Sequence, residues 1–501
     1  MDFAKKGKMS IMIVVLSALF SYFLITLNYF PYLGISLTLI LFSILVYSLK
    51  KVKNNETSIY FIITVTFALF IFIRSEGLLT FFNLTPTMFF GSLMSLSGNK
   101  FINYKFFPTI TTPLYIVIKS LLTKNQLVSV SDLNVKKGIS KNSLNNITGI
   151  IITIMIMAVV LPLLASANPY FQKYLGSFLS VDWIKELFIN IGYKEIFVWS
   201  LRLVFFLFFI FIIPKFITLV NKTNIKSEID LNLPSVPLTI PKITVAIVLI
   251  LFFITQFQLY FSSDETLKQL GYSHSQYTRE VFAQLTVVAF IVFILVYNGK
   301  IKTSLNTKLN NALVFQGIFL ALMAFKSVLD YSQTWGFTYK RLYGFAVATW
   351  ILGIFLMYLY KYKNKLSDSI LIKNTVIYTG IMLMIVNIFN FDYLIYHYRK
   401  STTGQGTDYE YLATLSADSL SYDEQYKHLI EKVVQEPDNV SSIEKNISWR
   451  LLAKIGSLQK KYNNPDLRTF NLLDFLQYRR IKHINLQEYY IYSTHTSPQL
   501  R

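Results

Sequence analysis

The stretch that decides the fold is KKVKNNETSIYFIITVTFALFIFIRSEG, residues 50–77. Three lysines precede an apolar run over 58–74, and the run ends at Arg74-Ser75-Glu76-Gly77, which predicts a tight corner. A helix rises about 1.5 Å per residue, so a run of this length approaches the thickness of a bilayer core. The next run, 77–97, is also apolar. The stretch therefore predicts two membrane-spanning helices joined by a short corner.

The same pattern extends over most of the chain. With 53% hydrophobic and 15% charged residues, the composition lies outside the range of ordinary soluble domains. The sequence predicts an all-α fold, a polytopic helical membrane bundle of about eleven spans with a small helical extracytoplasmic C-terminal domain. The expected spans are 10–30, 32–49, 58–74, 77–97, 147–166, 196–214, 243–262, 280–298, 311–329, 343–360 and 375–392.

Six lysine clusters fall at alternate gaps between these segments. They hold 24 lysines and, with the adjoining Asp2 and Glu56, six acidic residues, whereas the short intervening gaps hold eight basic and eight acidic residues. Short cytoplasmic loops retain Lys and Arg, so this pattern predicts a cytoplasmic N-terminus and an extracytoplasmic C-terminus. The clusters lie at 5–8, 50–53, 100–141, 215–242, 300–308 and 361–373.

The composition also excludes several classes of function. The net charge of +21 is concentrated in the lysine clusters, where topology explains it, so nucleic-acid binding is not expected. The bilayer is the expected partner, with anionic lipid headgroups at the cytoplasmic face. The chain has no cysteine, its five histidines lack metal-ligand spacing, and it has no Gly-rich phosphate loop. No cofactor, metal or catalytic residue is predicted.

Four segments follow from this pattern. Residues 1–98 hold the first four spans, and 99–146 form a basic cytoplasmic or interfacial loop. Residues 147–392 hold the remaining seven spans, and 393–501 form the C-terminal domain, with helical periodicity around 421–434, 443–461 and 470–480. That last segment carries 14 basic and 12 acidic residues, a balance unlike the lysine clusters.

Charged residues at one membrane depth form the candidate site. Lys326 and Asp330 are four residues apart and can pair on one helix face. The alternative is that Arg202 and Lys326 extend to the interface, and that the others are ordinary charges at loop ends. The predicted outer-rim polar network contains Arg74, Glu76, Arg202, Asp264, Arg279, Glu280, Lys326, Asp330, Arg341, Asp392 and Asp408.

Two function classes stay open. The absence of acidic residues deep in the spans argues against an ion-coupled transporter, and the first outer loop, 28–32, lacks the carboxylate of many lipid-dependent glycosyltransferases. We expect a non-enzymatic membrane protein that binds or moves a small molecule, lipid or protein partner. The alternative is a transferase acting on a lipid-linked substrate. A deep cavity with two carboxylates would favour the transferase. A closed bundle with a charged rim would favour a scaffold or sensor, and a central pathway would favour a transporter.

Three stretches carry a resemblance to a known family. They are 264–285, 339–350 and 387–418, which include Tyr277-Thr278-Arg279, Tyr339-Lys340-Arg341 and Asp408 to Asp418. Over about 245–420 the chain resembles a bacterial multi-pass membrane family, domain of unknown function number 4173, related to number 4153. The resemblance implies an integral protein of the bacterial envelope and its plasma membrane, and it supplies no catalytic residues. In these stretches we expect Arg279 beside Asp264 or Asp330, and a helix from Asp408 that docks at the rim.

Overall fold

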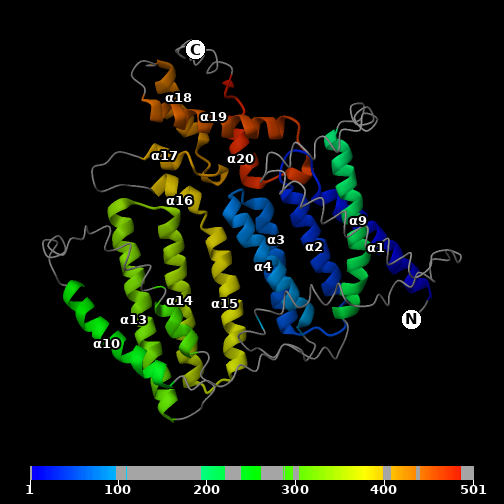
Figure 1. The fold of residues 1–501 in the computed structure, drawn as a ribbon. Coiled ribbons are helices and arrows are strands. Elements are labelled where there is room, and N and C mark those ends of the chain that lie inside the picture. The colour runs from blue at the N-terminus through cyan, green and yellow to red at the C-terminus, as the bar shows by residue number, and fades with distance from the viewer. Residues whose placement is uncertain are drawn as a thin grey trace, which may run out of the picture.

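The computed structural model describes residues 3–97, 193–220, 239–260, 288–296, 304–398, 408–435 and 441–486, together with Thr109 and Thr286. Within these residues all regular secondary structure is helical (Figure 1). Six of the described helices are long and apolar enough to cross a bilayer, which indicates a membrane protein. They are α2, α3, α9, α13, α14 and α15.

The first group of helices comes mainly from the N-terminal part of the chain. It contains α1 (Phe3–Leu24), α2 (Tyr32–Leu49), α3 (Asn55–Ile73), α4 (Gly77–Leu96) and α9 (Tyr193–Val220). Helix α3 begins where the sequence provides a capping box, in which Asn54 accepts from the Thr57 backbone N–H and Thr57 accepts from the Asn54 N–H. A core of α2–α4 side chains includes Tyr60, Phe67 and Phe90, all almost fully buried.

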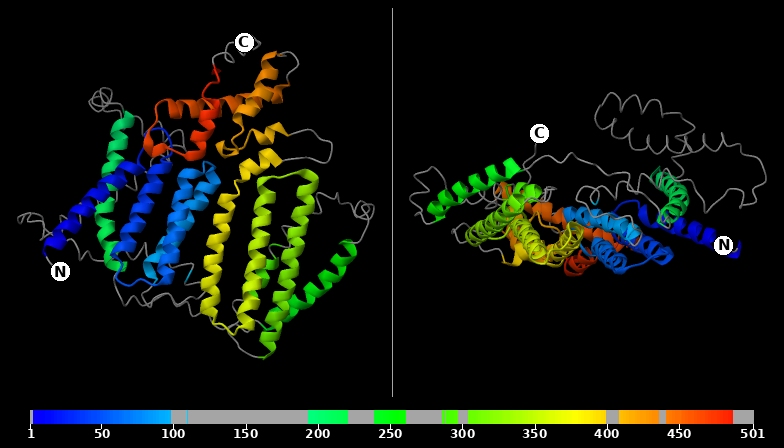
Figure 2. Two further views of the ribbon diagram at one scale, coloured as in Figure 1. Left: turned by 180° about the vertical axis from the view of Figure 1, so that it is seen from behind. Right: turned by 90° about the horizontal axis from the view of Figure 1, so that it is seen from below.

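The second group contains α10 (Thr239–Tyr260), α13 (Ser304–Trp335), α14 (Tyr339–Lys363) and α15 (Asp368–Ile388). Its core is aliphatic and aromatic, with Leu313, Leu320 and Phe355 buried where α13 faces α14. Seen from below, the described helices of the two groups form an elongated slab (Figure 2). The two groups lie side by side in both views of this figure.

Helix α15 joins the two groups along a seam with α3 and α4. At one end of the seam Lys373 pairs with Glu56 at 2.7 Å. In the middle, Gly380 lies against the ring of Phe90, where an added Cβ would be 2.7 Å from Cζ. At the other end the side chain of Arg74 donates to Asn390 Oδ1 at 3.1 Å. The seam is therefore fixed at three depths.

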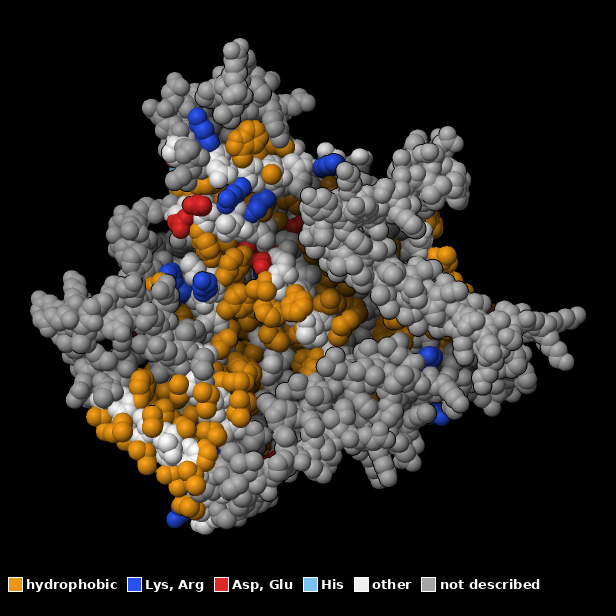
Figure 3. All heavy atoms as spheres, viewed as in Figure 1, with side chains coloured by type: hydrophobic (Ala, Val, Ile, Leu, Met, Phe, Trp, Pro, Cys, Tyr) orange, Lys and Arg blue, Asp and Glu red, His pale blue; other side chains and the backbone are white. Residues whose placement is uncertain are grey.

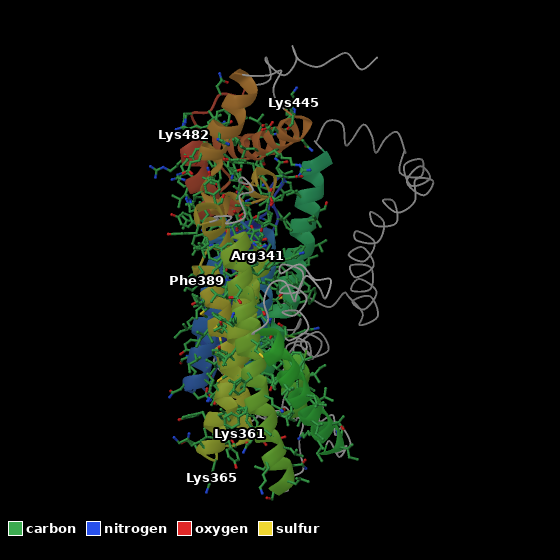
Figure 4. The ribbon with its side chains drawn as sticks, turned by 90° about the vertical axis from the view of Figure 1, so that its left-hand side faces the viewer. Arg341, Lys361, Lys365, Phe389, Lys445 and Lys482 are labelled. Carbon is green, nitrogen blue, oxygen red and sulfur yellow. The ribbon has the colours of Figure 1, made fainter. Side chains whose placement is uncertain are left out.

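The remaining helices form a C-terminal module on one end of the bundle. It contains α16 (Phe391–Tyr398), α17 (Tyr409–Leu412), the 3-10 helix η2 (Ala417–Ser419), α18 (Tyr422–Gln435), α19 (Ser442–Asn463), the 3-10 helix η4 (Leu467–Thr469) and α20 (Leu472–Ile481). We call this end of the bundle the capped end and the opposite end the lysine end. Figure 4 shows Lys361 and Lys365 at the lysine end and Lys445 and Lys482 in the module.

Nine of the expected spans overlap a described helix, and six of these nine helices are long and apolar enough to cross a bilayer. The expected span 147–166 lies outside the described residues, as does the loop 99–146 apart from Thr109, and 280–298 is described only in part. Eleven spans therefore stays a prediction. Several boundaries differ, and α1 already ends at Leu24. The difference that bears on the site is at α15, which ends at Ile388, because Asn390 adopts φ 33° and redirects the chain into α16. Asp392 thus lies on a separate short helix rather than at the end of a span.

Candidate functional site

A buried ion pair connects the α3–α4 corner to the C-terminal module. Arg74 Nε lies 2.9 Å from Asp418 Oδ2, and the two side chains are 3% and 0% exposed. Asp418 Oδ1 also accepts from the backbone N–H and the hydroxyl of Ser75, at 2.8 and 2.7 Å. The Asn390 amide donates to the Asp418 carbonyl oxygen at 2.8 Å. Residues 343 positions apart in the sequence are therefore joined by charge-assisted hydrogen bonds.

A second buried carboxylate holds the same segment of the module. Asp392 Oδ1 accepts from the backbone N–H of Ser416 at 2.8 Å, from its hydroxyl at 3.1 Å and from the Tyr339 hydroxyl. Asn471 completes the contact by donating to the Arg74 carbonyl oxygen at 2.9 Å. We call this set the clasp. It consists of Arg74, Ser75, Tyr339, Asn390, Asp392, Ser416, Asp418 and Asn471.

Burial shifts the pKa of one clasp carboxyl, that of Asp418. Desolvation raises the pKa of the Asp418 carboxyl to about 6, with the nearby carboxylate of Asp392 adding to the rise and Arg74 opposing it. Beside the clasp, Glu76 caps α4 by accepting from the N–H groups of Leu78 and Leu79 at 3.1 and 2.5 Å. Burial raises the pKa of the Glu76 carboxyl against those two hydrogen bonds, and Asp392 adds to the rise.

A different cluster anchors the module at α1 and α9. Arg202 donates to the Ile25 carbonyl oxygen at 3.2 Å and lies over the rings of Tyr22 and Trp199. Arg468 of η4 donates to the same carbonyl oxygen at 3.0 Å and also lies over the Tyr22 ring. These cation–π and hydrogen-bond contacts give Arg202 a positioning role apart from the clasp.

The predicted rim residues thus fall into separate sets. Arg74 and Asp392 belong to the clasp, and Glu76 lies beside it. Lys326 and Asp330 pair with each other at 2.5 Å, as their spacing predicts. Arg341 donates to the Gly336 carbonyl oxygen and lies over the Tyr331 ring. Asp408 caps α17. The predictions for Asp264, Arg279 and Glu280 lie outside the described residues.

Several clasp residues were missing from the predicted network. Asp418 stands in the third stretch that carries the family resemblance, but no periodicity in the sequence places it against Arg74. Asn390 and Ser416 lie at turns, where short polar side chains bond to nearby backbone. Asn471 caps α20 through its side-chain oxygen, a position that its place before an apolar run could have indicated.

The fold and the clasp together define a class of protein. It is an all-helical protein with several helices of membrane length, and a docked helical module covers one end of its bundle. The family comparison matches residues 61–426 to a domain of unknown function, DUF4153, and the chain belongs to this family. The match is to number 4153, the related family of the sequence analysis, rather than to 4173, and it begins well before residue 245. No curated protein and no solved structure matches the chain significantly.

Proposed function

We propose that this protein is a non-enzymatic integral membrane protein of the bacterial envelope, a scaffold or sensor on which an envelope molecule binds. The observation that carries this proposal is the buried Arg74–Asp418 pair. The pair fixes the C-terminal module on the bundle, so the charges of Arg74 and Asp418 are not open to a substrate. A catalytic carboxylate needs access to the reacting atoms, whereas both clasp carboxylates are fully buried and bonded to structural donors.

The proposal includes a location and an orientation. We place the bundle in the bacterial cytoplasmic membrane, with the N-terminus in the cytoplasm and the C-terminal module outside. Support comes from the arrangement of the lysine clusters. Those around Lys50 and Lys361 lie at the lysine end, opposite the C-terminal module (Figures 1 and 4). Because cytoplasmic loops retain lysine, this arrangement supports a module on the outer side.

The chain's lack of cysteine makes the orientation directly testable. Ser304 begins α13 at the lysine end, and Ser441 is the exposed cap of α19 in the module. Single S304C and S441C variants are labelled in intact cells with a membrane-impermeant maleimide. We expect labelling of S441C alone, and of both variants after lysis. Labelling of S304C alone in intact cells would invert the orientation and make a cytoplasmic partner the better hypothesis.

A second experiment distinguishes the proposed binding function from that of a transferase acting on a lipid-linked substrate. Lipid extracts of a deletion strain are compared by mass spectrometry with those of strains restored with wild type or with E76Q. We expect no lipid-linked precursor to accumulate in any strain. Accumulation in the deletion strain, corrected by wild type but not by E76Q, would overturn the non-enzymatic proposal.

A further inference from the structure

An open pocket of about 460 Å³ lies between the start of α4 and the first turns of α14. This volume is within the range of small-molecule sites. The pocket wall is formed by Leu78 of α4, by Thr286 and by residues of α14. The lining residues are Glu76, Leu78, Thr286, Tyr339, Lys340, Tyr343, Gly344 and Val347.

The pocket has a polar end and an apolar end along the bundle axis. Glu76, Tyr339 and Lys340 lie where α4 and α14 begin, at the capped end. Val347 lies eight residues further along α14, about 12 Å deeper at the helical rise. A ligand that fits this wall therefore has a charged head at the level of the helix ends and an apolar part below it.

The pocket opens toward the lipid-facing surface of the bundle. Leu78 is 47% and Val347 37% exposed, although both are apolar wall residues. Phe81, one turn along α4 from Leu78, is 61% exposed. On the face shown in Figure 3, hydrophobic side chains predominate among the described residues below a band that contains charged groups. Apolar surface of this kind on membrane-length helices contacts acyl chains.

The charges at the polar end are of opposite sign. The Glu76 carboxylate accepts from two backbone N–H groups, which leaves lone pairs for one further donor. Lys340 is exposed, and its ammonium suits a phosphate. The Tyr343 hydroxyl is buried and has no hydrogen-bond partner among the described residues. An ammonium beside Glu76 and a phosphate beside Lys340 together describe a zwitterionic headgroup.

We infer that this pocket binds the headgroup and upper chain of a zwitterionic glycerophospholipid with a primary amine. The charge complementarity of Glu76 and Lys340 selects the head, and Leu78 and Val347 contact the chain. The pocket itself does not depend on the proposed function; only the choice of leaflet rests on the proposed orientation. With the module outside the cell, the lipid comes from the outer leaflet.

Native mass spectrometry of the full chain, exchanged into phosphatidylethanolamine or phosphatidylglycerol, tests the inference. We expect wild type to retain one phosphatidylethanolamine at least tenfold better than phosphatidylglycerol, a difference of about 1.4 kcal/mol. V347W fills the apolar end and is expected to abolish retention. The matched control is L356W, because Leu356 is an exposed residue of the same helix outside the pocket lining.

E76Q supplies a test that does not depend on filling the pocket. It removes the negative charge and is expected to abolish the preference for phosphatidylethanolamine while the protein stays folded. Equal retention of the two lipids by wild type would overturn the inference, and so would V347W retaining lipid as L356W does. If V347W does not fold, the result for E76Q decides. If the maleimide experiment shows the inverted orientation, the bound lipid comes from the other leaflet, and its retention in native mass spectrometry is still expected.

Discussion

The clasp holds two charged side chains in a buried environment, where the loss of their hydration costs free energy. Moving an arginine and an aspartate out of water costs several kcal/mol per ion, so such a pair is stable only when its geometry is good and its remaining groups are satisfied. Arg74 Nε and Asp418 Oδ2 lie 2.9 Å apart as an ion pair without a hydrogen bond between them, and Ser75 and Asn390 form hydrogen bonds with the other groups of the pair. The pair therefore gives the module a single docked position. Loss of one partner leaves the other charge buried alone.

Replacing Arg74 by methionine should expose this cost. We expect R74M to destabilise the protein by about 3–5 kcal/mol at pH 8, because the Asp418 carboxylate then has no counter-ion. The double variant R74M/D418L should recover a large part of that loss. Unfolding of each variant in detergent, followed by tryptophan fluorescence, measures the change.

The control for this prediction is K326M. Lys326 forms an exposed pair with Asp330, and exposed pairs contribute less than about 1 kcal/mol. K326M should therefore have a small effect. Equal losses from R74M and K326M would show that burial does not determine the strength of the clasp.

Asp418 also predicts a dependence of stability on pH. Its pKa is about 6 in the folded protein against an ordinary value of 3.8, so the folded state binds the proton more tightly. The stabilising contribution is complete below about pH 4 and is lost as the pH rises through 6. The difference between the folded and the ordinary pKa corresponds to about 3 kcal/mol in the free energy of unfolding.

D418N removes this titrating group, which faces Arg74 and Asp392. We expect the wild-type free energy of unfolding to fall between pH 4 and pH 7 relative to that of D418N. Denaturant unfolding of both proteins at several pH values measures the difference. Parallel curves would mean that another group dominates the pH dependence of this region.

The sequence indicated the depth of the charged residues but not their partners. Hydrophobic periodicity and lysine alternation place Arg74 and Asp392 near helix ends, because each helix has a definite length and direction. They do not determine which distant side chain closes the contact. The pair with Asp418 depends on how α16 and η2 turn over the bundle, and that turn begins at Asn390. Lys326–Asp330 was predictable because its geometry is local to one helix turn.

At the scale of elements, close helix contacts depend on glycine. Gly34 of α2 lies so near α1 that an added Cβ would be 2.0 Å from the Phe23 carbonyl oxygen. Small residues allow such approaches in membrane helix packing, where the backbone itself is the neighbour. Backbone cannot move aside as a flexible side chain can. Gly77, at the start of α4, is a natural contrast, because an added Cβ there meets nothing within 4 Å.

Alanine substitution at these two glycines should therefore have opposite effects. We expect G34A to destabilise the protein by about 1–3 kcal/mol through overpacking. G77A should be neutral or stabilise it by up to about 1 kcal/mol, because alanine favours the helix. Thermal unfolding in the same detergent measures both. A stable G34A would show that α1 moves away from α2 at little cost.

The sequence predicted the positions of the helices better than it predicted the residues at which they end. The run 343–360 lies within α14, and the run 58–74 ends at Arg74, the residue that caps α3, because long apolar segments specify membrane helices directly. The break between α15 and α16 was missed, because the chain stays apolar through Phe389 and Phe391. Phe389 and Asn390 separate the two helices, and the left-handed backbone of Asn390 turns the chain. A polar residue that tolerates this conformation was the available signal.

At the scale of the whole molecule, the seam supports the proposed scaffold over a transporter. Alternating access needs one group of helices to move against the other. Here Lys373–Glu56 joins the groups at the lysine end, Gly380–Phe90 in the middle, and Arg74–Asn390 at the capped end. The C-terminal module adds a further restraint, because its Asp418 and Asn471 both bind the α3–α4 corner. A seam fixed at both ends favours a single arrangement of the two groups.

Spin-label distances across the seam test this directly. At the lysine end, V52C and K365C place labels on exposed residues that follow α2 and α14; at the capped end, F30C and F389C place them before α2 and after α15. In lipid nanodiscs we expect one narrow distance distribution for each pair. R74M should broaden only the capped-end distribution, because Lys373–Glu56 still joins the groups at the other end. Two distances whose populations change in opposite directions at the two ends would instead identify rocking of the groups, and transport would replace the scaffold.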